Sequence, residues 1–151
     1  TQADYAPARL DWQQTWYLSV WARFRDRGLF QRTYEDYIGI FVEPNLNSWW
    51  QHRPFQFDGS AAFTAGVAEA LLQSHAGQIH LLPCLPKEWR EGHFRGLRAR
   101  GGVTVDARWN TDNLWVTLTA NQNGQFAVRH GKTVRTINLP KDRPAHLRFP
   151  D

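Results

Sequence analysis

Apolar side chains recur at helical spacing through the first half of the chain. Two adjoining stripes occupy residues 12–26, one formed by Trp12, Trp16 and Val20 and the other by Tyr17, Trp21 and Phe24. This spacing predicts a helix. Asp11 precedes it as a candidate cap, and the arginine-containing segment that ends at Gly28 is typical of a helix end. Because the predicted helix is apolar on two sides, we expect it to be largely buried.

Two further helices are predicted in the first half of the chain. One runs from about Phe30 to Val42, and Pro44 ends it. The other covers residues 61–75, with Gly77 as its stop signal. Gly66 inside this helix costs about 1 kcal/mol relative to Ala, so we expect close backbone packing at that position.

The second half of the chain changes to alternation with a period of two. The alternating segments are residues 93–100, 103–109, 114–120, 125–130 and 132–139. Turn formers separate them, which predicts a small antiparallel β-domain, most simply a sandwich. Between the halves, Pro83 and Pro86 interrupt a short strand and restrict it to an edge position. The predicted fold class is therefore α+β, with helices first and strands second.

Composition narrows the function classes. The 18 basic and 14 acidic residues give a formal charge of +4, and acidic residues interrupt the densest basic stretch, residues 87–100. This pattern does not favour nucleic-acid binding. Cys84 is the only cysteine, so an intrachain disulfide is excluded, and its apolar neighbours predict a small buried hydrophobe. No apolar run has membrane-spanning length, and His75 and His80 lack a third metal ligand at suitable spacing. We therefore expect no membrane partner, metal or cofactor.

Several separate motifs occur in a recognisable order. They are Trp21-Ala-Arg-Phe-Arg-Asp26, His52-Arg-Pro-Phe-Gln-Phe-Asp58-Gly, Thr64-Ala-Gly-Val-Ala-Glu-Ala-Leu-Leu-Gln-Ser-His75, Gly77-Gln-Ile-His-Leu-Leu-Pro-Cys-Leu-Pro86 and Gly96-Leu-Arg-Ala-Arg-Gly-Gly102. Together they resemble glycoside hydrolase family 95, whose second motif usually reads His-Pro-Pro-Phe-Gln-Ile-Asp-Gly-Asn-Phe-Gly. The resemblance runs from about residue 12 to residue 120. After Gly59 this chain departs from the family, with Ser-Ala-Ala in place of Asn-Phe-Gly.

The resemblance implies an architecture. Enzymes of this family have an N-terminal β-domain, an (α/α)6 barrel and a C-terminal β-domain. Residues 1–77 would then be the last helices of the catalytic barrel, residues 78–86 a linker strand, and residues 87–151 the C-terminal β-domain. The absence of Met, including at position 1, also indicates a piece of a longer protein.

The resemblance also implies a chemistry. The family cleaves terminal α-L-fucosyl or related α-L-galactosyl linkages with inversion. A Glu acts as the acid, asparagine amides hold the attacking water, and an Asp polarises the amides. Asp58 matches that Asp, and His52 matches a histidine that lines the sugar pocket. No segment here matches the Glu or the asparagines, so we expect the chain to need the remainder of the same enzyme and to be inactive alone. The resemblance favours a secreted or periplasmic location.

Each of these residues also has a simpler interpretation. Asp58 stands before the third predicted helix and could be its N-cap. His52 could bond to the loop backbone, and Trp50, like Trp49, could stack on a sugar ring or pack the loop against the helices. Glu69 is interpreted as a partner of a buried basic group rather than as the acid. An enzyme part acting on an oligosaccharide or glycan therefore stands beside an alternative function, a non-catalytic carbohydrate-binding or interaction module.

Overall fold

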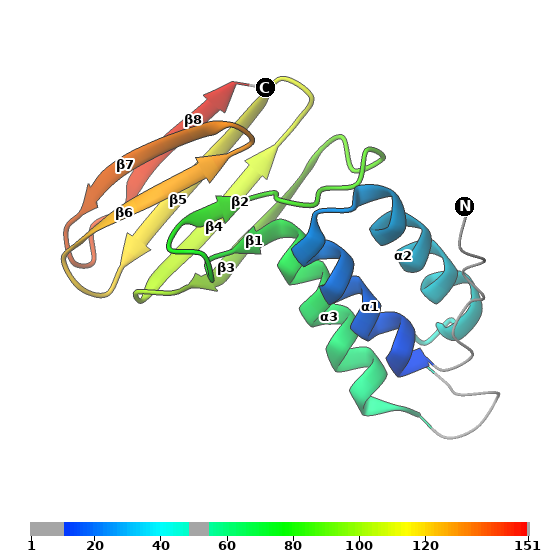
Figure 1. The fold of residues 1–151 in the computed structure, drawn as a ribbon. Helices are drawn as coiled ribbons and strands as arrows, with labels where there is room; N and C mark the ends of the chain where they lie inside the picture. Colours follow the sequence, from blue (N-terminus) through cyan, green and yellow to red (C-terminus); the bar gives the residue numbers. More distant parts are fainter. Residues whose placement is uncertain (1–10, 49–54, 151) are drawn as a thin grey trace. The chain divides into compact units, whose positions relative to one another are not determined.

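The computed structural model describes residues 11–48 and 55–150. Within these ranges three helices precede eight strands (Figure 1), so the predicted α+β class with helices first is confirmed. The chain divides into two compact units, which meet between Ala70 and Leu71. The predicted domain boundaries at residues 77 and 87 stay predictions. None of the helices in the described ranges is long and apolar enough to cross a membrane.

The first unit is built from α1 (Asp11–Phe24), α2 (Arg27–Phe41) and α3 (Phe57–Leu71). Its core holds Leu18, Ala22, Phe30, Tyr37 and Phe41, which are all buried. The rings of Tyr37 and Phe63 stack with their centroids 4.8 Å apart and join α2 to α3. A Cβ added to Gly66 would lie 2.6 Å from the Leu18 Cβ, so the close packing predicted at this glycine is confirmed.

The junction between α1 and α2 differs from the prediction, which was a helix over residues 12–26 with Gly28 as its stop signal. Helix α1 already ends at Phe24, and Arg25 takes the left-handed conformation with φ 59°. The Asp26 carboxylate then accepts a hydrogen bond from the Leu29 N–H at 2.9 Å and caps α2. Gly28 therefore lies in the first turn of α2, because an aspartate cap starts the next helix at once.

The expectation that the first helix is largely buried is wrong. The buried residues of α1 are Asp11, Gln14, Thr15, Leu18 and Ala22, a narrow and partly polar stripe. In contrast, Trp16 is 59% and Phe24 is 77% exposed. Each of the two predicted apolar stripes of α1 therefore has a member that faces outward, Trp16 in the first and Phe24 in the second.

The third helix spans Phe57–Leu71 rather than residues 61–75. The next two residues form β1 (Leu72–Gln73), which pairs antiparallel with β2 (Ile79–Leu81). The Leu82 N–H also donates to the Leu71 carbonyl at 2.8 Å. Helix α3 ends at Leu71 because Leu72 and Gln73 pair with β2, and the Leu71 carbonyl accepts from Leu82, instead of continuing the helical hydrogen bonds. Gly77, with φ 73°, lies in the turn between the two strands.

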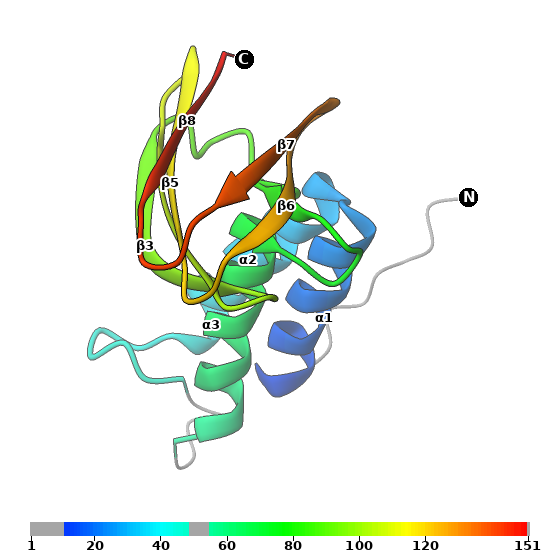
Figure 2. The same ribbon diagram turned by 90° about the vertical axis from the view of Figure 1, so that its left-hand side faces the viewer.

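The second unit is a sandwich of two four-stranded sheets (Figures 1 and 2). The remaining strands are β3 (Gly92–Ala99), β4 (Val103–Trp109), β5 (Asn113–Ala120), β6 (Gly124–His130), β7 (Thr133–Leu139) and β8 (Ala145–Pro150). One sheet has the order β1-β2-β6-β7 and the other β3-β4-β5-β8. The five predicted segments correspond to β3 through β7 within one residue at each end. Strand β8 has no counterpart among the predicted segments.

Strand β2 is not the edge strand that the prolines suggested. It lies between β1 and β6 and runs parallel to β6, with Ile79 opposite Val128. The strand ends at Leu81, and Leu82 turns the chain away with φ 50° before Pro83 is reached. The prolines therefore stand outside the hydrogen-bonded ladder and place no limit on its position.

Alternating side chains of both sheets fill the core of the sandwich. On β4 and β5 the inward residues Val103, Val105, Leu114, Val116 and Leu118 are almost completely buried. The rings of His130 and Phe149, from opposite sheets, lie 5.7 Å apart, and the Arg135 guanidinium lies 4.7 Å from the Phe149 ring. Cys84 is fully buried, which confirms its prediction as a small buried hydrophobe.

Candidate functional site

Asp58 lies in the first turn of α3, where its side chain is exposed. Its Oδ1 accepts a hydrogen bond from the Gly59 N–H at 3.1 Å. The residue is inside the helix rather than at the cap position, since α3 begins at Phe57. A negative charge there is favoured by the free N–H groups and the positive end of the helix dipole. The carboxylate is thus held at a fixed place and remains accessible.

The two other predicted site residues, His52 and Trp50, lie outside the described residues. Their predicted roles in sugar binding therefore stay predictions. Asp58 is the one predicted site residue for which the structure gives a position.

A buried polar cluster lies behind the first turn of α3. Asp11 and Ser48 are 0% and 1% exposed. The Ser48 hydroxyl donates to Asp11 Oδ2 at 3.1 Å, and its oxygen lies 3.1 Å from the Ser60 Oγ. An ionised carboxylate only accepts, so Ser48 uses its single proton on Asp11 and receives the proton of Ser60. We call these three residues the Asp11 cluster.

Gly59 brings the Asp11 cluster against the turn that carries Asp58. A Cβ at this position would lie 2.3 Å from Asp11 Oδ2 and 2.9 Å from its Cγ. Only glycine permits this approach of a buried carboxylate to the helix backbone. The pair Asp58-Gly59 therefore has two roles. Asp58 presents an accessible carboxylate, and Gly59, which has no side chain, leaves room for the buried carboxylate of Asp11.

Burial shifts the pKa values of two groups in and beside the Asp11 cluster. Burial raises the pKa of Asp11, and the nearby negative charge of Asp58 raises it further, against the opposing hydrogen bonds from Trp12 and Ser48. Burial also raises the pKa of Tyr37, with the Asp11 charge adding to it and the Ser48 and Ser60 hydroxyls opposing it. The negative charge of Asp58 thus acts on Asp11 across the start of α3.

Sequence reasoning gave Asp11 only the role of a helix cap. The structure places it in a network with Ser48 and Ser60, which are 37 and 49 positions away in the chain. The sequence carried one signal for this, because a glycine inside a helical segment often has a packing reason. The identity of the group that packs there could not be obtained from the sequence.

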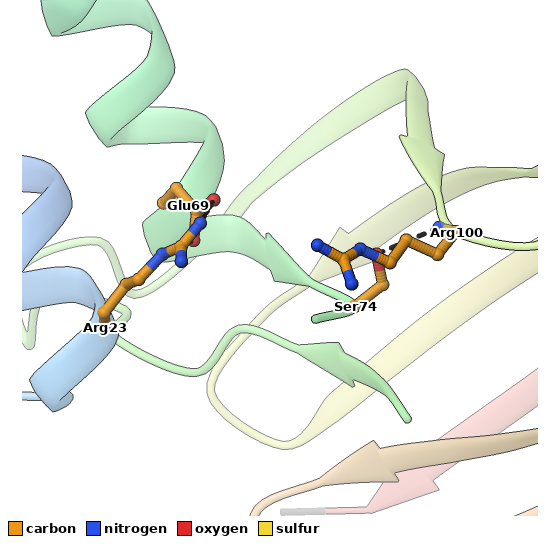
Figure 3. A network of polar contacts seen from close by, with 4 residues as sticks. All are labelled: Arg23, Glu69, Ser74 and Arg100. Atoms are coloured by element: carbon orange, nitrogen blue, oxygen red, sulfur yellow. Dashed lines mark hydrogen bonds and ion pairs between the residues drawn. The ribbon is translucent and has the colours of Figure 1, made fainter. Parts of the chain in front are cut away.

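Glu69 has a basic partner, as predicted, but that partner is not buried. Its carboxylate accepts two hydrogen bonds from Arg23, at 2.9 and 3.2 Å, and joins α1 to α3 (Figure 3). The Arg23 side chain is 53% exposed. In the second unit, the Arg100 N–H donates to the Ser74 Oγ at 2.9 Å and fixes the turn after β3 (Figure 3). Among the described residues no group of three His, Cys, Asp or Glu side chains could hold a metal ion.

Comparison with known proteins places both units in the same class, the glycoside hydrolases. Residues 6–71 match the glycosyl hydrolase family 95 catalytic domain, and residues 73–146 match the glycoside hydrolase family 95 C-terminal domain. The chain belongs to glycoside hydrolase family 95. Over 116 residues it is 39% identical to alpha-L-fucosidase 2 of Arabidopsis thaliana, covering 68% of this chain and 13% of that protein.

A likeness among solved structures agrees with this fold. A human-microbiome protein assigned as a kojibiose phosphorylase superposes with a TM-score of 0.56 at 10% sequence identity. The match covers 97% of this chain and 20% of that protein. At this identity the likeness concerns the fold alone, which is that of terminal barrel helices followed by a small β-domain.

Proposed function

We propose that this chain is the C-terminal part of an inverting glycoside hydrolase that cleaves terminal α-L-fucosyl or related α-L-galactosyl linkages. The observation that carries the proposal is the family motif around Asp58, which opens a helix within the part that matches the family's catalytic domain. The 39% identity to a protein named alpha-L-fucosidase 2 supports the choice of sugar.

Asp58 is the residue to which we assign a catalytic role. Inversion requires an acid for the leaving oxygen and a base that activates water on the opposite face of the sugar. In the proposed mechanism Asp58 polarises an amide that holds this water. Among the described residues its carboxylate bonds only to the Gly59 N–H, so it remains available to a further donor. The acid and the water-holding amides would come from the remainder of the enzyme.

The exposed aromatic side of α1 supports a larger catalytic domain. Trp16 and Phe24, which are 59% and 77% exposed, belong to a helix that matches the family's catalytic domain. Apolar surface of this kind is normally covered in a folded protein. We therefore propose that other helices of the same enzyme pack on this side, and that the chain alone does not turn over substrate.

The test is Asp58→Asn in the full-length parent enzyme, assayed on an aryl α-L-fucoside. The amide keeps a similar shape but removes the negative charge, so we expect turnover to fall by roughly 10²-fold or more. NMR of the first-formed sugar should show inverted anomeric configuration for the wild type.

The matched control is Asp36→Asn, which removes one carboxylate from α2 outside the motif. It should leave turnover within about twofold, since surface substitutions away from a site are nearly neutral. Near-normal turnover of Asp58→Asn would show that this carboxylate has no catalytic role.

A further inference from the structure

The outer face of the β3-β4-β5-β8 sheet is hollowed. The hollow has a volume of about 780 Å³ and is lined by residues of all four strands. Sites for small molecules typically measure about 300–1,000 Å³. Within the second unit, this face is turned away from β6 and β7, and no described strand of that unit covers it (Figure 2).

Two rows of side chains cross the sheet on this face. Cross-strand pairing aligns His93, Arg108, Trp115 and Arg148 in the first row and Asp106, Thr117 and His146 in the second. Paired residues share one face of a sheet. Rows that stand two residues apart along a strand are separated by about 7 Å. An aromatic ring, basic groups and a carboxylate therefore stand within the span of one or two sugar rings.

Trp115 is the aromatic platform of this face. Its side chain is 39% exposed, although the neighbouring positions Leu114 and Val116 are buried in the core. An exposed indole flanked by charged residues is unfavourable for the isolated chain, because moving a large apolar ring out of water lowers the free energy. A flat apolar surface surrounded by polar groups matches a sugar ring, which has an apolar C–H face and a rim of hydroxyl groups.

The polar lining supplies both donors and acceptors without a net charge. Among the residues that line the hollow, the guanidinium groups of Arg95 and Arg108 are balanced by the carboxylates of Glu91 and Asp106, and Arg148 of the first row lies outside this lining. The structure records no hydrogen bond or ion pair for the Arg108 side chain among the described residues. Oδ1 of Asp106 accepts the Gly96 N–H at 2.7 Å, which leaves its second oxygen available. This balance fits a neutral ligand rich in hydroxyl groups better than an anionic one.

From this geometry we propose that the outer face of the β3-β4-β5-β8 sheet is a second, non-catalytic site that binds a neutral saccharide chain. Trp115 stacks on a sugar ring, Arg108 donates to its hydroxyl groups, and Asp106 accepts from them. The site belongs to the second unit, whereas Asp58 belongs to the first, and, if the proposed function holds, it would bind the glycan whose terminal sugar the enzyme removes. It does not depend on the identity of that terminal sugar.

The experiment is native affinity electrophoresis of the 151-residue chain in gels that contain one polysaccharide. The neutral probes are xyloglucan, galactomannan and arabinan, and the acidic probe is polygalacturonate. Trp115→Ala and Arg108→Gln are compared with Trp16→Ala, which also removes an exposed tryptophan but from α1. Circular dichroism confirms that each variant is folded, and Arg108→Gln keeps the test informative if Trp115→Ala fails to fold.

We expect at least one neutral polysaccharide to retard the wild type and Trp16→Ala equally. Trp115→Ala should bind at least about tenfold more weakly, Arg108→Gln should also bind more weakly, and high salt should have little effect. Retardation by no neutral probe, or equal retardation of all variants, would overturn the proposal. Retardation by polygalacturonate alone, lost at high salt, would show an anion-binding face instead. A wild-type dimer that Trp115→Ala converts to a monomer in light scattering would make a second copy the occupant.

Discussion

Gly66 provides a quantitative test of how α1 and α3 pack. In Gly66→Ala the new Cβ would lie 2.6 Å from the Leu18 Cβ and 3.4 Å from the Ser19 backbone nitrogen. Carbon atoms normally approach to about 3.5–4.0 Å, so the two helices must separate locally by about 1 Å. A rotamer change cannot relieve the contact, because the Cβ of the fully buried Leu18 is fixed by its backbone.

Two effects of opposite sign decide the stability of this variant. Overpacking a closely packed contact costs about 1–3 kcal/mol, while replacing a helical Gly with Ala gains up to about 1 kcal/mol. We expect a net loss of about 1 kcal/mol in the free energy of unfolding. Gly39→Ala is the matched control, because no atom lies within 4 Å of a Cβ added there in α2. The free energy of unfolding of Gly39→Ala should rise by up to about 1 kcal/mol.

The assay is thermal unfolding of both variants and the wild type, followed by the helical circular dichroism signal. The variants should differ by about 2 kcal/mol, which corresponds to a difference of about 4–8 °C in Tm for a chain of this size. The difference between the two variants removes the shared gain in helix propensity. A Tm of Gly66→Ala equal to or above that of Gly39→Ala would refute the close packing of α1 on α3.

Three further predictions concern the start of α3 and the bridge between helices. Gly59→Ala should destabilise the chain by about 1–3 kcal/mol in thermal melts, because the new Cβ overlaps the Asp11 carboxylate; an unchanged Tm would contradict this. Since burial raises the pKa of Asp11, its ionisation costs stability as the pH rises above the ordinary carboxyl range. The Tm of Asp11→Asn minus the Tm of the wild type should therefore increase as the pH rises from about 4 to about 7. A Tm difference that does not depend on pH would contradict the assignment. Glu69→Gln should cost about 0.5–1 kcal/mol at low salt and less at high salt, because its partner Arg23 is half exposed; a loss that salt does not reduce would argue against the ion pair.

The candidate site was only partly accessible to prediction from the sequence. The motif around Asp58 identified an acidic residue at the start of a helix, and the structure places that residue in the first turn of α3. The Asp11 cluster was not predicted. Its members come from α1, the segment after α2, and α3, and hydrogen bonds between such distant positions leave no periodic signal in the sequence.

Local pattern by itself identified the three helices and the segments of β3–β7, but neither β1 nor β8. The period-two segments correspond to β3–β7, because alternation along a strand is set by the pleated backbone of that strand. Tertiary structure decided where elements end and which faces are covered. Leu72 pairs with Leu81 in the sheet instead of extending α3. Trp16 and Phe24 of α1 are exposed, because the burial of a side chain depends on partners elsewhere in the chain. Sheet order, close contacts such as that at Gly59, and the burial of Asp11 are non-local properties, so only the folded chain determines them.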